Sequence, residues 1–308
     1  MIFRLNTLFK RDSNGKIREY NIEYTRDGVM SAGYRTVAGI QGGKMVTSEW
    51  KLTEGKNIGK VNETTPGEQA SKEAIAKWEK KEEKEYFEDI TKIDTYTKFK
   101  PMLAHDYTKR PQSSGYSQPK LDGIRCIATS TGLWTRAGKE ITTCDHIKLQ
   151  LKQIFRNDEN LVLDGELYNH ELKADFNKIT SLVRKVKPSP EEIVECMEKV
   201  EYHIYDSYTP SHPFPFINRW MHVKESMTRE WIETDNSDSI RIVPTKLCNT
   251  QEELDELYAR YIEQGYEGQM VRNNEPYEFK RSKHLLKRKE FITEEFDVVE
   301  VKEGQGNW

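Results

Sequence analysis

The stretch that most constrains this chain is residues 119–125, which read Pro-Lys-Leu-Asp-Gly-Ile-Arg. Side chains two residues apart in a strand point to the same face, so Lys120 and Asp122 would share a face there. The Asp-Gly step is a turn signal, because glycine tolerates a positive φ. We therefore expect Lys120 at the end of one strand, with Arg125 returning toward it on the next.

A lysine in that position suits covalent catalysis by an amine. Free lysine is protonated at neutral pH, with a pKa of about 10.4. Burial or nearby cations can lower that pKa and produce a nucleophile. The alternative is a surface turn with two solvated charges, and residues 119–125 alone leave both interpretations open, because short motifs recur by chance.

Length, charge and cysteine content limit the number of domains and the kinds of partner that this chain can have. The 308 residues have room for two domains, and 48 Lys and Arg against 51 Asp and Glu give a net charge of −3. A nucleic-acid partner must therefore use a local basic surface. The 4 cysteines are widely spaced, which is typical of reduced thiols. No apolar run suits a signal peptide or a membrane span, so we expect a cytoplasmic protein with no membrane partner.

Residues 1–90 predict a small β+α domain. Strand-like runs at residues 3–5, 17–24, 34–40 and 45–52 are separated by hairpin signals at residues 14–15, 27–28 and 42–43. A threonine cap before Pro66 predicts a helix that runs to about Tyr86, with Ala70, Ala74 and Trp78 on one face.

This β-then-helix unit resembles the WGR nucleic-acid-binding module in its aromatic strands, glycine hairpins and final Glu-Ala-x-x-x-Trp helix, although Trp-Gly-Arg is absent. The alternative is an accessory domain without a nucleic-acid partner. A phosphate-facing surface could come from basic residues interleaved with Phe9 and Trp50. These basic residues are Lys10, Arg11, Lys16, Arg18, Lys44, Lys51, Lys56 and Lys60.

After a linker and lead-in at residues 91–115, strands and helices alternate. We expect strands at residues 124–129, 161–167 and 202–206, and helices at residues 145–155, 176–183, 191–197, 216–231 and 251–263. In the last helix, the residues that follow the 3.6-residue period predict core packing. They are Leu254, Leu257, Tyr258, Tyr261 and Ile262.

Four more stretches follow in order: residues 163–167 (Leu-Asp-Gly-Glu-Leu), 202–206 (Tyr-His-Ile-Tyr-Asp), 267–272 (Glu-Gly-Gln-Met-Val-Arg) and 285–289 (Leu-Leu-Lys-Arg-Lys). With residues 119–125, this series resembles the motifs of the covalent nucleotidyltransferases, the superfamily of DNA ligases, RNA ligases and mRNA capping enzymes. One match is weak evidence, whereas five in order are strong. The resemblance is closest to ATP-dependent DNA ligases of phage or bacterial type.

The resemblance implies both a fold and a reaction. The fold is α+β, with a nucleotidyltransferase (adenylation) domain of two antiparallel sheets flanked by helices. The reaction seals nicks in duplex DNA: Lys120 attacks the α-phosphate of ATP, AMP passes to the 5′-phosphate, and the 3′-hydroxyl displaces AMP. Each step transfers a phosphoryl-type group, so the protein mainly positions reactants and neutralises charge.

The resemblance assigns roles to charged residues near Lys120. Lys287 and Lys289 would grip the α-phosphate and lower the pKa of Lys120, while strand alternation turns the residue between them toward DNA. Glu166 matches a residue that contacts the ribose and is also a candidate metal ligand. Glu267 matches a ligand of the divalent ion, Mg²⁺ or Mn²⁺, which needs few carboxylates because it keeps several waters. Asp122 is a weaker candidate ligand.

Other positions would contact the nucleotide or the DNA end. Tyr205 stands where the family stacks an aromatic ring on adenine; otherwise it is a core tyrosine. Arg125 and Arg136 match arginines that bind the ribose or the 5′-phosphate, which suits a planar guanidinium. Gln118 occupies the position that recognises the adenine edge. Arg272 replaces a lysine of many relatives, so its role stays open.

The resulting division is residues 1–90, 91–115, 116–292 (adenylation domain) and 293–308, where the resemblance implies the beginning of an OB-fold domain. The distal motif of that domain would orient pyrophosphate, so we expect these 308 residues to adenylate slowly. We expect a monomer that binds ATP and nicked DNA. The alternatives are an RNA ligase or capping-type enzyme, and a non-catalytic nucleic-acid-binding protein; the Pro-Met-Leu-Ala lead-in and the Glu-Gly-Gln-Gly-Asn-Trp end favour a DNA ligase.

Overall fold

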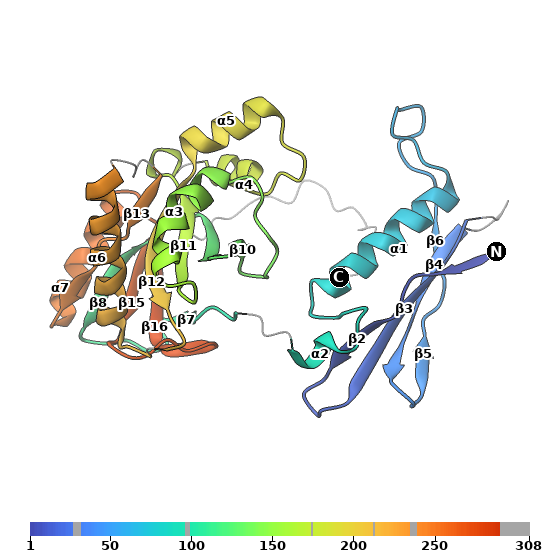
Figure 1. Ribbon diagram of the computed structural model, residues 1–308, viewed down its shortest axis with the longest axis horizontal. Helices are drawn as coiled ribbons and strands as arrows, with labels where there is room; N and C mark the ends of the chain where they lie inside the picture. The colour runs from blue at the N-terminus through green and yellow to red at the C-terminus, as the bar shows by residue number, and fades with distance from the viewer. Residues whose placement is uncertain (27–31, 96–98, 174, 212, 235–238, 290–308) are drawn as a thin grey trace, which may run out of the picture. The chain divides into compact units, whose positions relative to one another are not determined.

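The computed structural model describes residues 1–26, 32–95, 99–173, 175–211, 213–234 and 239–289 (Figure 1). The chain forms two compact units: the first contains Met1–Phe99, and the second contains Lys100–Arg136 and Glu140–Trp308. The predicted turn at residues 27–28 and the predicted start of an OB-fold at residues 293–308 lie outside the described residues.

The first unit is built on a six-stranded antiparallel sheet. Its strands are β1 (Ile2–Arg4), β2 (Leu8–Arg11), β3 (Ile17–Thr25), β4 (Ala32–Ile40), β5 (Met45–Thr47) and β6 (Lys51–Thr53). Turns at Gly15 and Gly42, with φ angles of 77° and 73°, join β2 to β3 and β4 to β5, as the glycines predict. The structure adds β2, which does not alternate clearly, and divides the expected run at residues 45–52 into β5 and β6.

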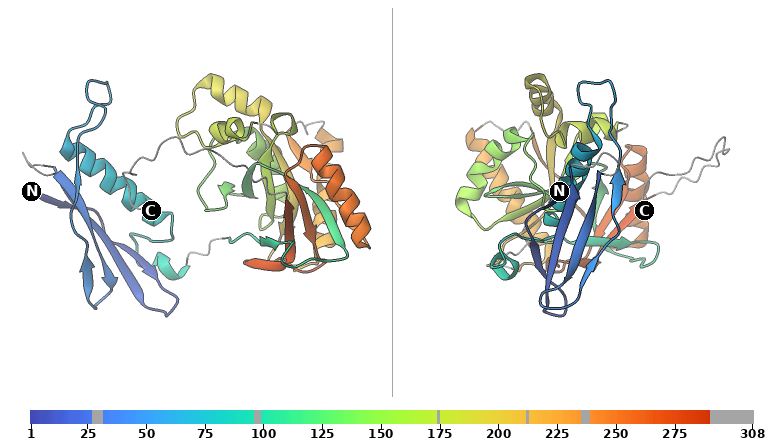
Figure 2. Two further views of the ribbon diagram at one scale, coloured as in Figure 1. Left: turned by 180° about the vertical axis from the view of Figure 1, so that it is seen from behind. Right: turned by 90° about the vertical axis from the view of Figure 1, so that its right-hand side faces the viewer.

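Helix α1 (Pro66–Glu82) lies across one face of this sheet (Figures 1 and 2). It begins as predicted, because Thr65 caps it and forms a reciprocal capping box with Glu68, while Pro66 occupies the first turn. It ends at Glu82, earlier than expected. A short helix, α2 (Lys92–Thr95), follows.

Alanines let α1 approach the sheet closely. Ala70 and Ala74 have no exposed surface, and Trp78 packs beside them, which confirms the predicted face. The core beneath contains Leu8, Tyr20, Ile22, Tyr24 and Tyr34.

The second unit contains two five-stranded sheets flanked by helices, which confirms the predicted α+β fold. The β9 sheet has the strand order β10-β9-β11-β12-β13, and the β8 sheet has the order β14-β8-β15-β16-β7. The strands are β7 (Leu103–Asp106), β8 (Gly115–Lys120), β9 (Ile124–Thr129), β10 (Gly132–Thr135), β11 (Val162–Tyr168), β12 (Glu201–Tyr208), β13 (Ile240–Ile242), β14 (Lys246–Cys248), β15 (Gly268–Arg272) and β16 (Arg281–Lys289). Pairing is antiparallel except between β12 and β13 and between β16 and β7.

The helices of this unit bury the outer sides of the sheets (Figure 2). They are α3 (Asp145–Asn157), α4 (Phe176–Val183), α5 (Pro190–Lys199), α6 (Phe216–Thr234) and α7 (Gln251–Glu263), with a 3₁₀ turn, η1 (His170–Leu172). The core of the β9 sheet includes residues of α3, α4 and α6, whereas α7 packs on the β8 sheet. In α7, Leu254, Leu257 and Tyr261 are buried as predicted, while Tyr258 and Ile262 are half-buried.

Strand β7 lies in the segment expected to be a lead-in. Its four residues are all half-buried, so no alternation marks it as a strand, and its pairing with β16 defines it. This pairing brings Leu103 and Ala104 to the functional site. None of the helices in the described part of the chain is both long enough and apolar enough to cross a membrane.

Candidate active site

Residues 119–125 carry the chain from one sheet to the other. β8 ends at Lys120 and β9 begins at Ile124, so Lys120 belongs to the β8 sheet and Arg125 to the β9 sheet. Gly123 does not have the positive φ that the Asp-Gly turn signal predicts. A Cβ at this position would lie 2.3 Å from the carbonyl oxygen of Leu167, so glycine is required by the close approach to β11.

A cavity of about 280 Å³ opens where the two sheets meet. Seven of the predicted site residues line it: Gln118, Lys120, Arg125, Arg136, Glu166, Tyr205 and Lys287. The other lining residues are Leu103, Ala104, Pro119, Leu121, Met270, Arg272, Arg281 and Leu285. The fold therefore gathers residues from distant motifs around one space.

Glu267 connects the two lysines at one end of this space. Its carboxylate forms an ion pair with Lys120, and its other oxygen lies 3.3 Å from Nζ of Lys289. The register explains this proximity, because Gly268 pairs with Lys120 of β8 on one side and with Lys289 of β16 on the other. Lys289 thus lies close to Lys120, as predicted, and Glu267 pairs with both lysines, which the motifs did not predict.

Two carboxyl groups near Lys120 have raised pKa values. Burial raises the pKa of Glu166 to about 8, although the positive charges of Arg125 and Lys120 oppose the shift. Desolvation, and after it the charge of Glu267, raises the pKa of Asp122. Glu166 therefore holds a proton at neutral pH and can donate a hydrogen bond.

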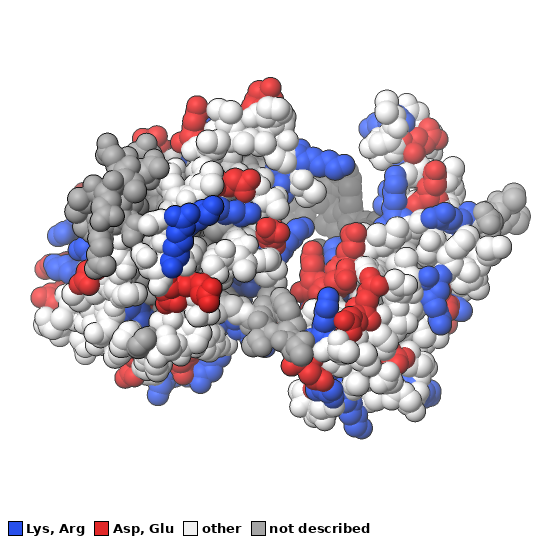
Figure 3. All heavy atoms as spheres, in the orientation of Figure 1, with Lys and Arg blue, Asp and Glu red and all other residues white. Residues whose placement is uncertain are grey.

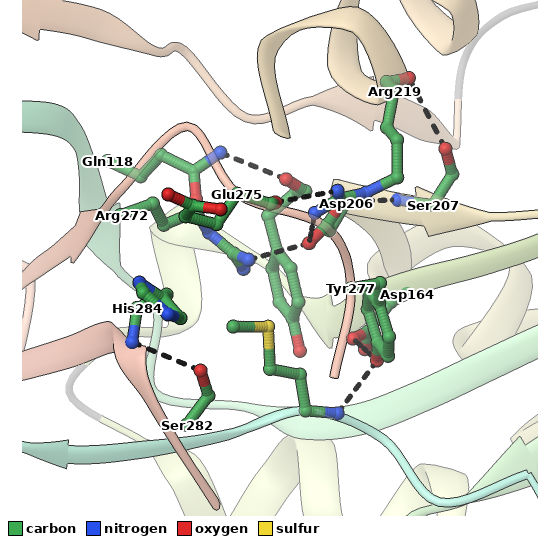
Figure 4. A network of polar contacts seen from close by, with 12 residues as sticks. Gln118, Asp164, Asp206, Ser207, Arg219, Arg272, Glu275, Tyr277, Ser282 and His284 are labelled. Atoms are coloured by element: carbon green, nitrogen blue, oxygen red, sulfur yellow. Dashed lines mark hydrogen bonds and ion pairs between the residues drawn. The ribbon is translucent and has the colours of Figure 1, made fainter. Parts of the chain in front are cut away.

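A buried aspartate lies behind the cavity, between two arginines (Figure 4). The carboxylate of Asp206 accepts two hydrogen bonds from Arg219 (2.9 and 3.0 Å) and one from Arg272 (2.7 Å). All three residues are at most 3 % exposed. This arrangement gives Arg272 a structural role that the motif comparison leaves open, and the sequence analysis does not find Arg219, which lies outside the motifs on α6.

Gln118 extends this network toward the cavity (Figure 4). Its Oε1 accepts a hydrogen bond from Nε of Arg272 (2.8 Å), and its Nε2 donates to the carbonyl of Tyr205 (3.0 Å) and to Oγ1 of Thr245 (2.8 Å). Both amide protons are thus engaged within the protein. The predicted contact of Gln118 with the adenine edge would therefore use the second lone pair of Oε1 as an acceptor.

A second buried aspartate holds Arg125. Asp164 accepts two hydrogen bonds from the Arg125 guanidinium (2.9 and 2.5 Å) and one from the Tyr277 hydroxyl (2.6 Å). That hydroxyl accepts a hydrogen bond from the backbone N–H of Met102 (2.9 Å), which precedes β7. Tyr277 is another residue that sequence reasoning misses, because only folding brings it to Asp164.

Two guanidinium groups lie near the ring of Tyr205, which lines the cavity. The guanidinium carbons of Arg125 and Arg272 are 5.8 and 5.4 Å from the centre of its ring. The ring packs partly on Leu121 and Val243, and burial raises the pKa of its hydroxyl. The ring position is therefore fixed by both sheets.

Strand β16 shows the predicted alternation. Lys287 lines the cavity and Lys289 contacts Glu267, whereas Arg288 points to the opposite face. There Arg288 pairs with Asp255 of α7 (2.5 Å) and lies 4.1 Å from the Tyr258 ring centre. Arg288 is thus paired within the protein, and its expected contact with DNA stays a prediction.

The model of the ATP dependent DNA ligase domain family matches residues 101–289, which span both sheets and all of the motifs above. The chain belongs to this family. The match runs from the residue before Met102 to the end of β16, so it includes every residue that lines the cavity.

Relatives of this ligase-family chain include viral, bacterial and phage proteins. It is 28 % identical over 286 residues to a DNA ligase of African swine fever virus (isolate Tick/South Africa/Pretoriuskop Pr4/1996), covering 86 % of this chain and 63 % of that protein. It is 27 % identical over 209 residues to a DNA ligase of Haemophilus influenzae, covering 67 % of this chain and 69 % of that protein. The chain thus spans less than two thirds of the viral relative's length.

Solved structures share the fold. The crystal structure titled Chlorella virus DNA ligase-adenylate matches with a TM-score of 0.50 and 26 % identity, covering 63 % of this chain and 69 % of that chain. The ATP-dependent DNA ligase from bacteriophage T7 in complex with ATP also has a TM-score of 0.50, at 18 % identity, covering 62 % and 69 %.

Proposed function

We propose that this chain uses ATP to seal nicks in duplex DNA through an AMP intermediate on Lys120. The observation that carries this proposal is the position of Lys120, at the end of β8, in a cavity shared by two sheets and paired with Glu267. Family membership supports the same reaction.

In the first step, the Lys120 amine attacks the α-phosphorus of ATP, a P–N bond forms, and the bond to pyrophosphate breaks. Lys120 must first lose a proton, and Glu267 is the carboxylate placed to accept it. Lys287 and Lys289 then neutralise charge that develops on the transferred group. The following steps move AMP to the 5′-phosphate of the nick and release it when the 3′-hydroxyl attacks.

The remaining cavity residues would position the nucleotide and the DNA end. The fixed ring of Tyr205 would stack on adenine, and protonated Glu166 would donate a hydrogen bond to a ribose oxygen. Arg125, held by Asp164, and Arg136 would contact the ribose or the 5′-phosphate. We keep Gln118 as a residue that fixes Tyr205.

A divalent cation, Mg²⁺ or Mn²⁺, fits this site only if the phosphates of ATP supply some of its ligands. No cluster of three or more His, Cys, Asp or Glu residues suitable for a metal occurs among the described residues, whereas Glu267 and Asp122 lie close enough to interact electrostatically. An ion held by these two carboxylates would take its other ligands from phosphates and water, and would neutralise phosphate charge. Glu166 remains a candidate ligand, and a bound cation would favour its ionised form.

Covalent labelling tests the proposal. Lys120→Ala should form no protein–AMP adduct after incubation with radiolabelled ATP and Mg²⁺, using protein first stripped of AMP with pyrophosphate. Lys152→Ala, at an exposed position on α3, is the matched control and should label like the unaltered chain. Labelling of Lys120→Ala would overturn the assignment.

The substrate is tested separately. ATP should label the chain and GTP should not, and adenylated protein should seal nicked DNA in preference to a nicked RNA duplex. A preference for GTP or for RNA would move the chain to the capping or RNA-ligase alternative. We keep a monomeric state, a cytoplasmic location and a role in DNA repair, replication and recombination as predictions.

A further inference from the structure

The ammonium groups of two α1 lysines, exposed Lys77 and half-buried Lys81, lie over tyrosine rings of the first unit. Nζ of Lys81 lies 4.3 Å from the Tyr20 ring centre and 4.7 Å from that of Tyr86. Nζ of Lys77, one turn earlier, lies 5.5 Å from the Tyr34 ring centre. With Lys10 of β2, 5.8 Å from the Tyr86 ring centre, these residues form a lysine–tyrosine stripe: Lys10, Lys77, Lys81, Tyr20, Tyr34 and Tyr86.

Several other cations of this unit are paired with carboxylates. Glu73 pairs with Lys51 and Lys56, and Glu23 pairs with Arg4 and Arg35. Among the described residues, neither Lys77 nor Lys81 has a carboxylate within ion-pair distance; Lys10 has Glu85 at 3.4 Å. The two α1 lysines thus leave positive charge uncompensated.

Neighbouring cations repel the ammonium groups of both lysines. Burial, followed by neighbouring cations that include Lys84 and Lys10, lowers the pKa of Lys81, and burial and Lys51 lower the pKa of Lys77. The Tyr20 hydroxyl, whose ring lies under Lys81, is buried and has no hydrogen-bond partner among the described residues. An anion bound beside these ammonium groups would offset the repulsion between the cations.

Acidic side chains and the two α1 lysines of the stripe lie on different sides of α1. Figure 3 shows Asp and Glu side chains gathered over the C-terminal half of α1 on the face toward the viewer. Glu82 lies near Glu79 and Glu88, whose charges help burial to raise its pKa. A polyanion would be repelled from this acidic side and attracted to the lysine side.

We propose that the lysine–tyrosine stripe binds backbone phosphates of the duplex DNA that flanks the nick. Phosphate supplies the negative charge that the stripe lacks, and Lys77 and Lys81 can each take one phosphate. The lysines cover the tyrosine rings, so bases cannot stack on them without displacing the ammonium groups. Recognition through the backbone therefore fits better than the base stacking that single strands use.

This surface differs from the one that the sequence predicts. The expected phosphate-facing set includes Lys51 and Lys56, but Glu73 neutralises both. Trp50, expected to interleave with the basic residues, already lies under the Arg35 guanidinium, 4.6 Å from its ring centre. Lys77 and Lys81, which do not belong to the expected set, take their place.

The inference rests on the proposed function for its choice of DNA, and binding can be measured without catalysis. The 308-residue chain and the double variant Lys77→Gln/Lys81→Gln would be titrated with fluorescent nicked duplex DNA, and in parallel with single-stranded DNA, in EDTA, without ATP, at several salt concentrations. The matched control is Lys44→Gln/Lys60→Gln, which removes two exposed lysines from the same unit.

The stripe variant should bind several-fold to tenfold more weakly, and its slope of log K against log[salt] should fall by about 1–2, because each phosphate contact contributes about 0.9. The control should change neither quantity. Equal losses in both variants would show a nonspecific charge effect, and a loss confined to single-stranded DNA would show a different ligand; either result overturns the proposal.

Two further measurements separate unfolding of the variant from a loss of phosphate contacts, and separate a failure of this inference from a failure of the proposed function. If Lys77→Gln/Lys81→Gln unfolds the unit, Lys77→Arg/Lys81→Arg keeps the charge and should bind DNA normally; weak binding by that folded variant would overturn the proposal. Adenylation of Lys120 should be unchanged in every variant. A chain that binds DNA through Lys77 and Lys81 but forms no AMP adduct would refute the proposed function and leave this inference standing.

Discussion

Cations lie beside tyrosine rings both in the cavity of the second unit and in the lysine–tyrosine stripe of the first unit. The two regions differ in whether carboxylates neutralise those cations. In the cavity, Arg125 is paired with Asp164, Arg272 with Asp206, and Lys120 with Glu267. In the stripe, Lys77 and Lys81 have no such partner among the described residues. Buried charges need partners to remain ordered, and the cavity needs ordered groups for its reaction. A surface that binds phosphate has the opposite requirement, because a carboxylate partner would neutralise the charge that attracts the phosphate.

The strongest test of this contrast is Asp206→Asn. It removes the carboxylate that two buried arginines share, so we expect a loss of about 3–5 kcal/mol in the free energy of unfolding. Urea denaturation measures this loss. Asp255→Asn, which breaks the more exposed pair with Arg288, should cost about 1 kcal/mol or less. A loss at Asp206 as small as that at Asp255 would contradict the importance of the buried network.

The second test concerns pH. The pKa of Glu166 is raised to about 8 in the folded chain, from an ordinary value of 4.5. Between these values the folded state keeps a proton that the unfolded state has lost. The contribution to stability is therefore complete below about pH 4.5, falls as pH rises, and levels off above about pH 8.

Glu166→Gln should remove this pH dependence. We expect the free energy of unfolding of the unaltered chain to fall by roughly 2–4 kcal/mol across this pH range, because the partial exposure of Glu166 reduces the effect of its pKa shift. Urea denaturation of both proteins from pH 5 to pH 9 provides the measurement. Parallel curves for the two proteins would mean that Glu166 is ionised in the folded chain.

The third test separates the tyrosines of the two regions. Tyr205→Ala should weaken ATP binding by about 1–3 kcal/mol if the ring stacks on adenine, and Tyr205→Phe should bind ATP normally; calorimetric titration with ATP measures both. Tyr34→Phe, in the stripe, should leave ATP binding unchanged. Equal weakening by Tyr205→Ala and Tyr205→Phe would show that the hydroxyl matters and the stacking role is wrong.

The smallest effect comes from two matching helix caps. Thr65 of α1 and Ser189 of α5 each form a capping box before a proline. Either residue changed to Ala should cost about 1 kcal/mol, measurable by hydrogen exchange of the helix amides. Only Thr65→Ala should also weaken DNA binding, because α1 carries the stripe. Equal DNA binding by the two variants would show that α1 is not part of the DNA-binding surface.

Periodic and local signals predicted the secondary structure of the second unit well. The bounds of α4, α7 and β9 match the expectation, and the remaining predicted elements agree within three residues at each end. Strands β10, β13 and β14 were not predicted. Strands β2 and β7 were missed as well, because four residues with weak alternation carry too little local information. Their existence depends on pairing with β3 and β16.

The sequence by itself determined the chemical groups, because the motif order identified Lys120, Glu166, Tyr205, Glu267, Lys287 and Lys289 before any geometry was known. Tertiary structure alone decided which charges have partners. Asp206 and Arg272 are 66 residues apart in the chain, and Tyr277 and Asp164 are 113 apart. The effect of a charge depends on the distance to its counter-charge and on burial. Both quantities are set when sheets and helices pack. Glu73 therefore neutralises Lys51, whereas Lys81 has no carboxylate within ion-pair distance among the described residues.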